Sequence, residues 1–400
     1  MKNLISLTFT ILLLTLITTL TVLYSDGYRL NTATTQNTNE TGIIVKTGML
    51  AVRSIPEGAK IYINDNEEAI TATDDTIPSL KPGKYKIRLE KEGFETWEKE
   101  VEVFSELVTD ITSVLVLRSP KLEPLTNTDV RAFDLSSDQN KIAFITRNEE
   151  TPGVWVLGLT GNPINLIKTD ARVLIADNIF GTPSLGEDVK WSPDNEQVLV
   201  KMNENGYLVY DITTSNTSLR PTNITDIKLI NEEWQIEWKE NFLSERLIII
   251  KNQGAPEWLI EDLQTVETTW SPDFDKLFYI KNDGTKDILT IYNMDDPLPV
   301  GEKRINQEII LSEDSSNIES KTSIYWYSDS YHLILVEKKN LTEDYYTISL
   351  IRIDGSNKTS LYDGILASNK AYPNPYEDKI VVLTSLKENS PKNLYAIAIR

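Results

Sequence analysis

The chain of 400 residues contains no cysteine and a single histidine, His332. Without cysteine there can be no disulfide, no thiolate nucleophile and no Cys-ligated zinc or iron–sulfur site. One histidine makes a Ser–His–Asp triad or a His-based metal site hard to build. His332 also lies in an apolar strand pattern with Tyr331, Leu333 and Leu335, which favours a structural role.

Short motifs of several enzyme classes are missing as well. The chain has no Gly-x-Ser-x-Gly elbow, no Walker loop and no dinucleotide-binding fingerprint. A glycosidase needs only two well-placed carboxylates, and the pairs Asp74-Asp75 and Asp295-Asp296 lie in expected loops. In so acidic a chain, the simpler interpretation of these acidic pairs is a solvated surface rather than a catalytic site. The same interpretation holds for Asp273 and Asp275 as against a calcium site. We predict no catalytic residue, no cofactor and no metal site.

Positive charge is scarce. The chain has 40 Lys and Arg against 60 Asp and Glu, a formal net charge of -20. Such a surface is repelled by phosphate backbones, so we predict no nucleic-acid partner.

What is present begins with an uncharged apolar run from Leu4 to Tyr24. A bilayer-spanning helix needs about 20 residues, whereas the apolar region of a cleavable signal has about 7–15. No small-x-small cleavage pattern follows, since the chain continues Tyr24-Ser25-Asp26-Gly27. We predict residues 1–24 as an uncleaved signal-anchor, with a removed signal peptide as the alternative. Lys2 is the only charged side chain before the run, which favours a cytoplasmic N-terminus and an extracytoplasmic remainder.

Residues 25–47 are rich in Thr, Asn and Gln and have little to bury. This composition predicts a flexible tether that holds the following domain off the membrane surface.

Short runs of alternating or β-branched residues, separated by turn residues, predict a small β-domain over residues 48–118. Between the first two strands a turn carries proline, which presets one dihedral angle, and glycine, which supplies a positive-φ position. The turn consists of Pro56, Glu57, Gly58 and Ala59. With the Leu80-x-Pro-Gly-x-Tyr85 approach to a strand, this segment resembles the PEGA domain, a small β-sandwich. The family's Gly-x-Thr-Pro stretch is replaced by residues 74–78, Asp-Asp-Thr-Ile-Pro. The resemblance implies an envelope-exposed, non-catalytic module for surface or wall contacts; an unrelated small sandwich is the alternative.

From residue 121 onward one order of elements recurs: a strand ending in Trp, a Ser-Pro-Asp turn, an apolar strand and a further alternating strand. Ser can bond the turn backbone, Pro sets φ at the next position and Asp suits the one after. The large Trp side chain can fill the wedge between neighbouring sheets. We therefore interpret these residues as scaffold: Trp191, Ser192, Pro193, Asp194, Trp270, Ser271, Pro272, Asp273, Trp326 and Asp329.

The repeat resembles the six-bladed β-propellers of the TolB type, whose turn is Trp-Ser-Pro-Asp-Gly. Asn195 and Phe274 stand here where that family has Gly. Further turns are expected near Asp138, Asp329 and Glu377. A decayed copy, with a strand at 234–238, a turn near Asn241 and strands at 246–251 and 257–260, would complete six blades of roughly 47 residues each. Seven blades are the alternative. The last blade stops at its third strand, so we expect residues 121–126 to pair with the C-terminal strand and close the propeller of residues 121–400.

The fold class predicted is thus all-β, a PEGA-like sandwich followed by a β-propeller on one transmembrane helix. We expect a membrane-anchored, non-enzymatic envelope protein whose outward propeller binds a protein, peptide or cell-wall glycan through loops or the central channel. One alternative is a glycan hydrolase or lyase that uses channel acids; another is a structural spacer. The ligand, the binding face and the oligomeric state do not follow from the sequence.

Overall fold

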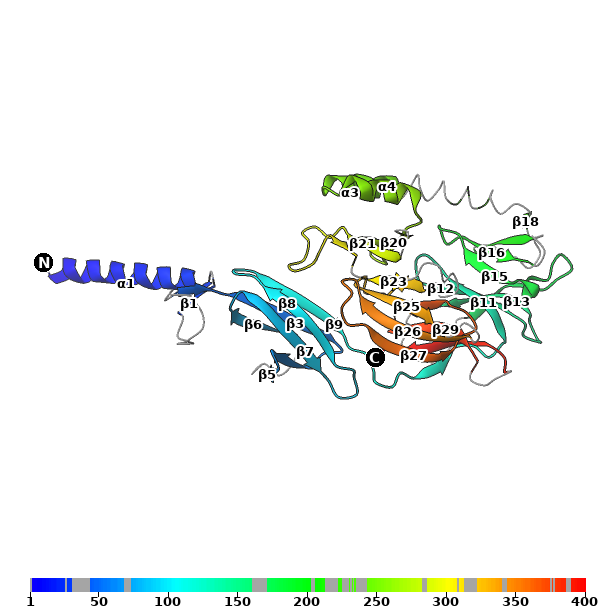
Figure 1. Ribbon diagram of the computed structural model, residues 1–400, viewed down its shortest axis with the longest axis horizontal. Coiled ribbons are helices and arrows are strands. Elements are labelled where there is room, and N and C mark those ends of the chain that lie inside the picture. Colours follow the sequence, from blue (N-terminus) through cyan, green and yellow to red (C-terminus); the bar gives the residue numbers. More distant parts are fainter. Residues whose placement is uncertain are drawn as a thin grey trace. The chain divides into compact units, whose positions relative to one another are not determined.

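The computed structural model forms two compact units, Met1–Leu115 with Asp296–Glu302, and Val116–Asp295 with Lys303–Arg400. Figure 1 shows the elements of both. The residues that the structure describes are 2–25, 27–30, 44–67, 73–159, 171–202, 206–212, 222–224, 230, 232, 234, 243–282, 286–307, 309–312, 322–339, 344–374, 376, 378–385 and 390–400.

Helix α1 (Lys2–Ser25) is long and apolar enough to cross a membrane, with a mean hydropathy of 2.1 over Ser6–Ser25. Five threonine hydroxyls of this helix donate to carbonyls three or four residues earlier. These bonds satisfy the hydroxyls inside the helix, which suits a lipid surrounding. A membrane anchor and a signal sequence both fit these features.

Two short strands lie inside the expected tether. Strand β1 (Tyr28–Leu30) pairs antiparallel with β2 (Ile44–Lys46). Tyr28, Ile44 and Val45 favour extended structure, because they are aromatic or β-branched. Residues 31–43, the middle of the tether, lie outside the described residues.

The first unit contains a β-sandwich of two sheets, with strand orders β6-β3-β9 and β5-β4-β7-β8. Alternating side chains from the two sheets meet in one core that includes Leu50, Ile61, Leu89, Trp97 and Ile111. The strands are β3 (Gly48–Ile55), β4 (Lys60–Ile63), β5 (Asn66–Glu67), β6 (Asp75–Leu80), β7 (Gly83–Glu90), β8 (Trp97–Val103) and β9 (Val108–Val114).

The second unit is a β-propeller whose described residues form five antiparallel sheets of four or five strands. The first sheet is β11 (Val130–Leu135), β12 (Lys141–Thr146), β13 (Gly153–Gly158) and β14 (Ala171–Ala176); the second is β15 (Asp188–Trp191), β16 (Gln197–Lys201), β17 (Tyr207–Asp211) and β18 (Thr222–Ile224). The third is β19 (Thr269–Trp270), β20 (Lys276–Asn282), β21 (Asp287–Asn293), β22 (Ile305–Asn306) and β23 (Ile310–Ser312). The fourth is β24 (Ser323–Trp326), β25 (His332–Lys338), β26 (Tyr345–Arg352) and β27 (Thr359–Ile365); the fifth is β28 (Ala371–Asn374), β29 (Lys379–Thr384), β30 (Asn393–Ala398) and β10 (Leu122–Pro124).

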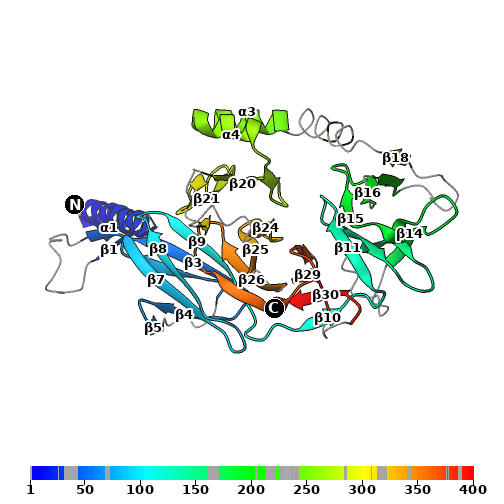
Figure 2. The same ribbon diagram turned by 45° about the vertical axis from the view of Figure 1, so that its right-hand side comes forward.

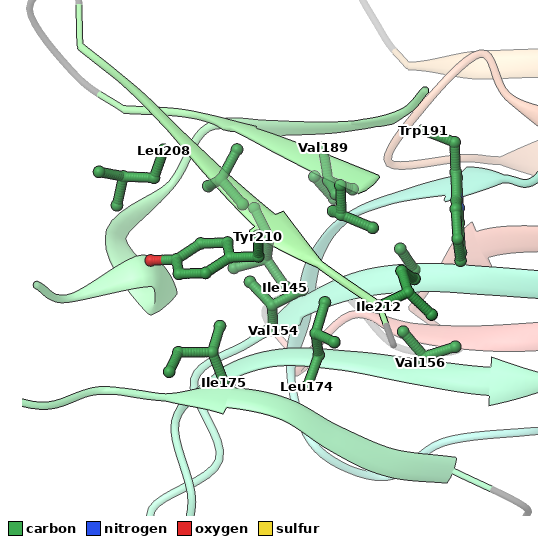
Figure 3. Close-up of a cluster of buried hydrophobic side chains, with 14 residues drawn as sticks. Ile145, Val154, Val156, Leu174, Ile175, Val189, Trp191, Leu208, Tyr210 and Ile212 are labelled. Carbon is green, nitrogen blue, oxygen red and sulfur yellow. The ribbon is translucent and has the colours of Figure 1, made fainter. Parts of the chain in front are cut away.

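Three pairs of sheets pack face to face through shared apolar clusters: the first with the second, the fifth with the first, and the third with the fourth. The first and second sheets share a cluster, in which Ile145 and Val154 meet Val189, Trp191 and other side chains (Figure 3). The fifth sheet packs on the first through Leu383 with Phe144 and its neighbours. This stacking explains why the second strand of each sheet is apolar on both sides.

Strand β10 belongs to the fifth sheet although it precedes the first in sequence. It pairs antiparallel with β30, with Leu122 opposite Ile397. Thus the beginning and the end of the propeller segment share one sheet, and the edge that β30 would expose is covered.

The strands expected at 246–251 and 257–260 are wrong. The structure has helices there, α3 (Ser244–Asn252) and α4 (Glu257–Thr265), which lie beside β20 and β21 (Figure 2). Ile250, Leu259 and Leu263 are buried against Leu277 and Tyr279 of the third sheet. This packing favours helix over the local β-branched pattern. Most of 234–238, together with Asn241 and Glu377, lies outside the described residues, so six blades are not confirmed.

Candidate functional site

Three turns between the first and second strands of their sheets share one hydrogen-bond pattern. In each, a serine Oγ donates to the aspartate two residues later at 2.5 Å; the pairs are Ser136–Asp138, Ser192–Asp194 and Ser271–Asp273. Burial raises the pKa of Asp138 and Asp273, but the serine and backbone N–H donors outweigh burial and lower it. The carboxylates of Asp138 and Asp273 are therefore held ionised as turn acceptors.

The residue after each turn aspartate adopts a left-handed conformation. Its φ is 56° at Gln139, 61° at Asn195, 60° at Phe274 and 61° at Ser330. Asn tolerates this region well, but a bulky side chain does so at a cost. Phe274 is therefore the strained member of the set.

Two of the predicted wedge tryptophans bond across sheets. Trp191 Nε1 donates to Asp134 O at 3.0 Å, which joins the second sheet to the first. Trp326 Nε1 donates to Thr269 O at 3.1 Å, which joins the fourth sheet to the third. Trp270 stands at the corresponding position of the third sheet and contributes to the wall of a cavity.

This cavity has a volume of about 750 Å³ and lies between the second and third sheets, where α4 ends. Its wall combines aromatic and aliphatic side chains with hydroxyl and amide groups and one residue of each charge. The lining residues are Ser137, Lys190, Trp191, Pro193, Trp234, Leu243, Leu263, Gln264, Thr265, Val266, Glu267, Thr268, Thr269, Trp270 and Phe274. The volume lies within the range of small-ligand sites, about 300–1,000 Å³.

A polar cluster adjoins this cavity through Trp191, and the first strands of four sheets supply or flank it. Asp134 accepts hydrogen bonds from the Tyr372 hydroxyl at 2.6 Å and from Trp191 N at 3.1 Å. Lys370 Nζ lies 3.0 Å from Asp188 Oδ1 and 3.9 Å from Asp134 Oδ1. Burial, more than any neighbour, raises the pKa of Asp134.

Tyrosines complete the cluster. The Tyr325 and Tyr372 rings meet edge to face, with centroids 5.0 Å apart. Burial raises the pKa of Tyr325 to about 12, and burial with the nearby Asp134 carboxylate raises the pKa of Tyr372 well above its usual value. Both hydroxyls therefore stay protonated and act as donors, Tyr325 to Asn369 O and Tyr372 to Asp134.

Other buried charges are neutralised within the scaffold. Lys276 is 1% exposed, lies 3.2 Å from Asp273 and 3.1 Å from Asp295, and faces the Tyr331 ring at 4.2 Å. His332 Nδ1 lies 2.6 Å from Asp329 Oδ2. Among the described residues no group of three His, Cys, Asp or Glu side chains could hold a metal ion.

The turn at Pro56–Ala59 in the first unit is closed by a residue that the sequence did not single out. Thr73 Oγ1 accepts from Gly58 N at 3.0 Å and Ala59 N at 3.2 Å, and it lies 2.5 Å from Ser54 Oγ. Ser54 Oγ in turn donates to Pro56 O at 2.8 Å. Because Thr73 Oγ1 already accepts two bonds, its proton is directed to Ser54. Gly58 has φ 83°, as the turn requires.

Comparison of the sequence with protein-family models gives a family for part of the chain. Residues 47–119 match the model of the PEGA domain. This confirms the expectation for the first β-domain, and we call it the PEGA domain below. A comparison with curated proteins found no match.

Solved structures resemble the chain with low identity. A TolB candidate from Agrobacterium tumefaciens has 14% identity and a TM-score of 0.25, with 67% of this chain and 77% of that chain covered. TolB from Acinetobacter baumannii has 12% identity and a TM-score of 0.28, with 78% and 60% covered. Kuenenia stuttgartiensis hydrazine synthase has 12% identity and a TM-score of 0.20, with 88% and 77% covered.

Of the residues that the sequence suggested as turn and wedge, the structure brings Trp191, Pro193 and Trp270 to the cavity wall. Sequence reasoning missed the contributions of Trp234, of Phe274 and of the end of α4. One signal was available, since a bulky Phe274 at a turn position that favours Gly is locally costly.

Proposed function

We propose that this protein is a membrane-anchored, non-enzymatic envelope protein whose propeller binds a cell-wall glycan in the cavity at Trp191, Trp234, Trp270 and Phe274. The helix α1 anchors it with the N-terminus in the cytoplasm, and the PEGA domain and propeller lie outside. The predicted turn and wedge residues hold the scaffold around this cavity.

Phe274 is the observation that carries the proposal. Its φ of 60° is unfavourable for a bulky residue, and its side chain is 40% exposed at the cavity wall. Backbone strain of this kind persists where the surrounding structure holds it and clusters at ligand sites. A glycine would relieve the strain but would remove the ring from the cavity.

The composition of the wall favours a glycan as the ligand. Sugar rings present flat C–H faces that pack on aromatic rings, together with hydroxyls that pair with amides and hydroxyls. Gln264, Thr265 and Ser137 can supply such partners. Lys190 and Glu267 are the charged residues of the lining and balance each other, so a neutral polar ligand fits better than a strongly charged one.

The test is titration of residues 44–400 with soluble wall oligosaccharides, with peptides as the comparison, followed by calorimetry. We expect saturable binding of an oligosaccharide that Phe274→Ala and Trp234→Ala each weaken by about 1–2 kcal/mol, or roughly 5–30-fold. Trp258→Ala is the matched control, because Trp258 is an exposed aromatic residue outside the cavity wall. Saturable binding of peptides alone would refute the glycan assignment. Absence of binding in both panels would leave the structural spacer.

A second candidate, a glycan hydrolase or lyase, is favoured by one observation: the raised pKa of Asp134, which suits a general acid, beside the second carboxylate, Asp188. Its test is turnover of wall polysaccharides that Asp134→Asn and Asp188→Asn abolish while Asp363→Asn, at a partly exposed ion pair, does not. We expect no turnover, because Lys370, Tyr372 and the Trp191 amide already engage the two carboxylates.

A further inference from the structure

The PEGA domain is hydrogen-bonded to the residues that directly follow helix α1. Gly27 lies two residues after α1, and its carbonyl accepts hydrogen bonds from Thr47 N at 2.9 Å and Thr47 Oγ1 at 2.7 Å. Arg29 donates to Tyr24 O at 2.7 Å and to Ser79 Oγ at 2.8 Å. The last turn of the helix is therefore connected to strand β6 of the domain through a single side chain.

The same end of the sandwich carries its exposed apolar side chains. Among the described residues of 44–115, the large hydrophobic residues with substantial exposure are Met49 at 38%, Leu107 at 46% and Val108 at 43%. Met49 and Val108 are direct partners in the β3–β9 pair, and Met49 N donates to Leu107 O. The three side chains thus form one patch, which we call the apolar edge.

The apolar edge lies close to the point where the chain leaves the span. Glu106 N donates to Thr47 O at 3.0 Å, and Thr47 is itself bonded to Gly27. Met49 follows Thr47 by two residues, or about 7 Å of extended chain. The polar zone on each side of a bilayer core is about 5–7 Å deep. A helix that spans the core therefore brings the apolar edge to the depth of the lipid headgroups.

Charge and aromatic residues at this end match such a surrounding. Arg29 lies over the Tyr24 ring at 3.7 Å, and Lys46 lies 5.2 Å from the Tyr28 ring centroid. Lys46 pairs with Glu106 at 2.7 Å, so Arg29 leaves a local positive charge on a strongly acidic chain. Tyrosine is enriched at membrane interfaces, and a long basic side chain near a helix end extends its charged group to the interface.

We propose that the apolar edge of the PEGA domain, Met49, Leu107 and Val108, is a membrane-contact surface that seats the domain on the outer face of the bilayer. The inference rests on α1 being retained as the anchor. It makes the domain a spacer of defined orientation, since a bonded connection and a second contact restrict how it can tilt.

The test uses the full chain in nanodiscs of phosphatidylcholine with a minority of phosphatidylglycerol. Because the chain has no cysteine, Val108→Cys and Glu92→Cys each provide a single site for an environment-sensitive dye. Glu92 lies in the turn between β7 and β8, at the other end of the sandwich. We expect the dye at position 108 to emit at shorter wavelength and to be quenched by spin-labelled lipid, and the dye at position 92 to be quenched by aqueous iodide.

Two further measurements separate the possible failures. Co-elution with nanodiscs reports on the anchor: a chain that does not co-elute refutes the anchor and this inference together. Co-elution with equal iodide quenching at both positions overturns the inference and leaves the anchor intact. Leu107→Glu should reduce lipid quenching at position 108, because a carboxylate disfavours the headgroup depth, whereas Leu107→Ile should retain it.

Discussion

Thr73 offers the sharpest test of how the PEGA turn is held. Thr73→Val replaces the hydroxyl by a methyl group of nearly the same size, so the packing volume stays constant while three hydrogen bonds are lost. These are the bonds to Gly58 N, Ala59 N and Ser54 Oγ. The substitution therefore isolates the polar contribution of one buried side chain.

The loss of stability depends on whether each former partner of Thr73 Oγ1 finds another hydrogen-bond partner. Gly58 is exposed, so water can replace its lost acceptor, and Ser54 still donates to Pro56 O. Ala59 is fully buried, and its N–H keeps no acceptor. An orphaned buried donor costs about 1–3 kcal/mol, and each replaced bond about 1 kcal/mol. We expect the free energy of unfolding of the PEGA domain to fall by about 2–3 kcal/mol.

Urea-dependent hydrogen exchange of residues 44–400, read from peptides that cover β3, β4 and β7, measures this domain within the longer chain. Thr76→Val is the matched control, because Thr76 is an exposed strand residue, and it should change stability by less than about 0.5 kcal/mol. Thr73→Ser keeps the hydroxyl and should recover part of the loss. Equal effects of Thr73→Val and Thr76→Val would refute the role of the hydroxyl.

Three further outcomes are expected in the propeller. Phe274→Gly should raise the urea midpoint of residues 44–400, because relief of the left-handed conformation is worth about 1 kcal/mol, while ligand affinity falls; a lower midpoint would contradict the strain. Lys370→Met should destabilise by about 2 kcal/mol, less than a fully buried pair because the side chain is partly exposed, whereas Lys339→Met at an exposed pair should show no measurable change. Burial by itself would raise the pKa of Asp329. His332 and neighbouring backbone N–H donors outweigh burial and lower this pKa. An acid whose pKa is lowered in the folded state contributes stability above its unfolded pKa of about 4, and this contribution is lost as the pH falls through the folded pKa. The difference in stability between the native chain and Asp329→Asn should therefore shrink in acid. A difference that does not depend on pH would count against the pairing of Asp329 with His332.

The sandwich and most propeller strands could be predicted because their signals are local. Short runs of consecutive apolar residues placed β12 (Lys141–Thr146) and β29 (Lys379–Thr384) at the expected residues. The turns between strands follow from Ser and Asp two positions apart, whose side chains bond within the turn itself. Such contacts need no knowledge of the remaining chain.

The segment between the second and third sheets could not be predicted in this way. Residues Arg246 to Lys251 contain a β-branched run that favours a strand, yet they form α3. A short apolar run does not distinguish a strand from a buried helix by its period. Ile250 and Leu259 are buried on the third sheet, and this tertiary burial decides the helical conformation.

The sequence by itself determined the order of the modules, the apolar helix, the PEGA turn and the repeated Ser–Asp turns, because each depends on neighbours within a few residues. Only the tertiary structure decided that Trp191, Trp270 and Phe274 border one cavity and that Thr73 closes the turn at Gly58. It also decided that the apolar edge lies beside Gly27. These are contacts between residues far apart in the chain, and burial and hydrogen bonding across elements select them.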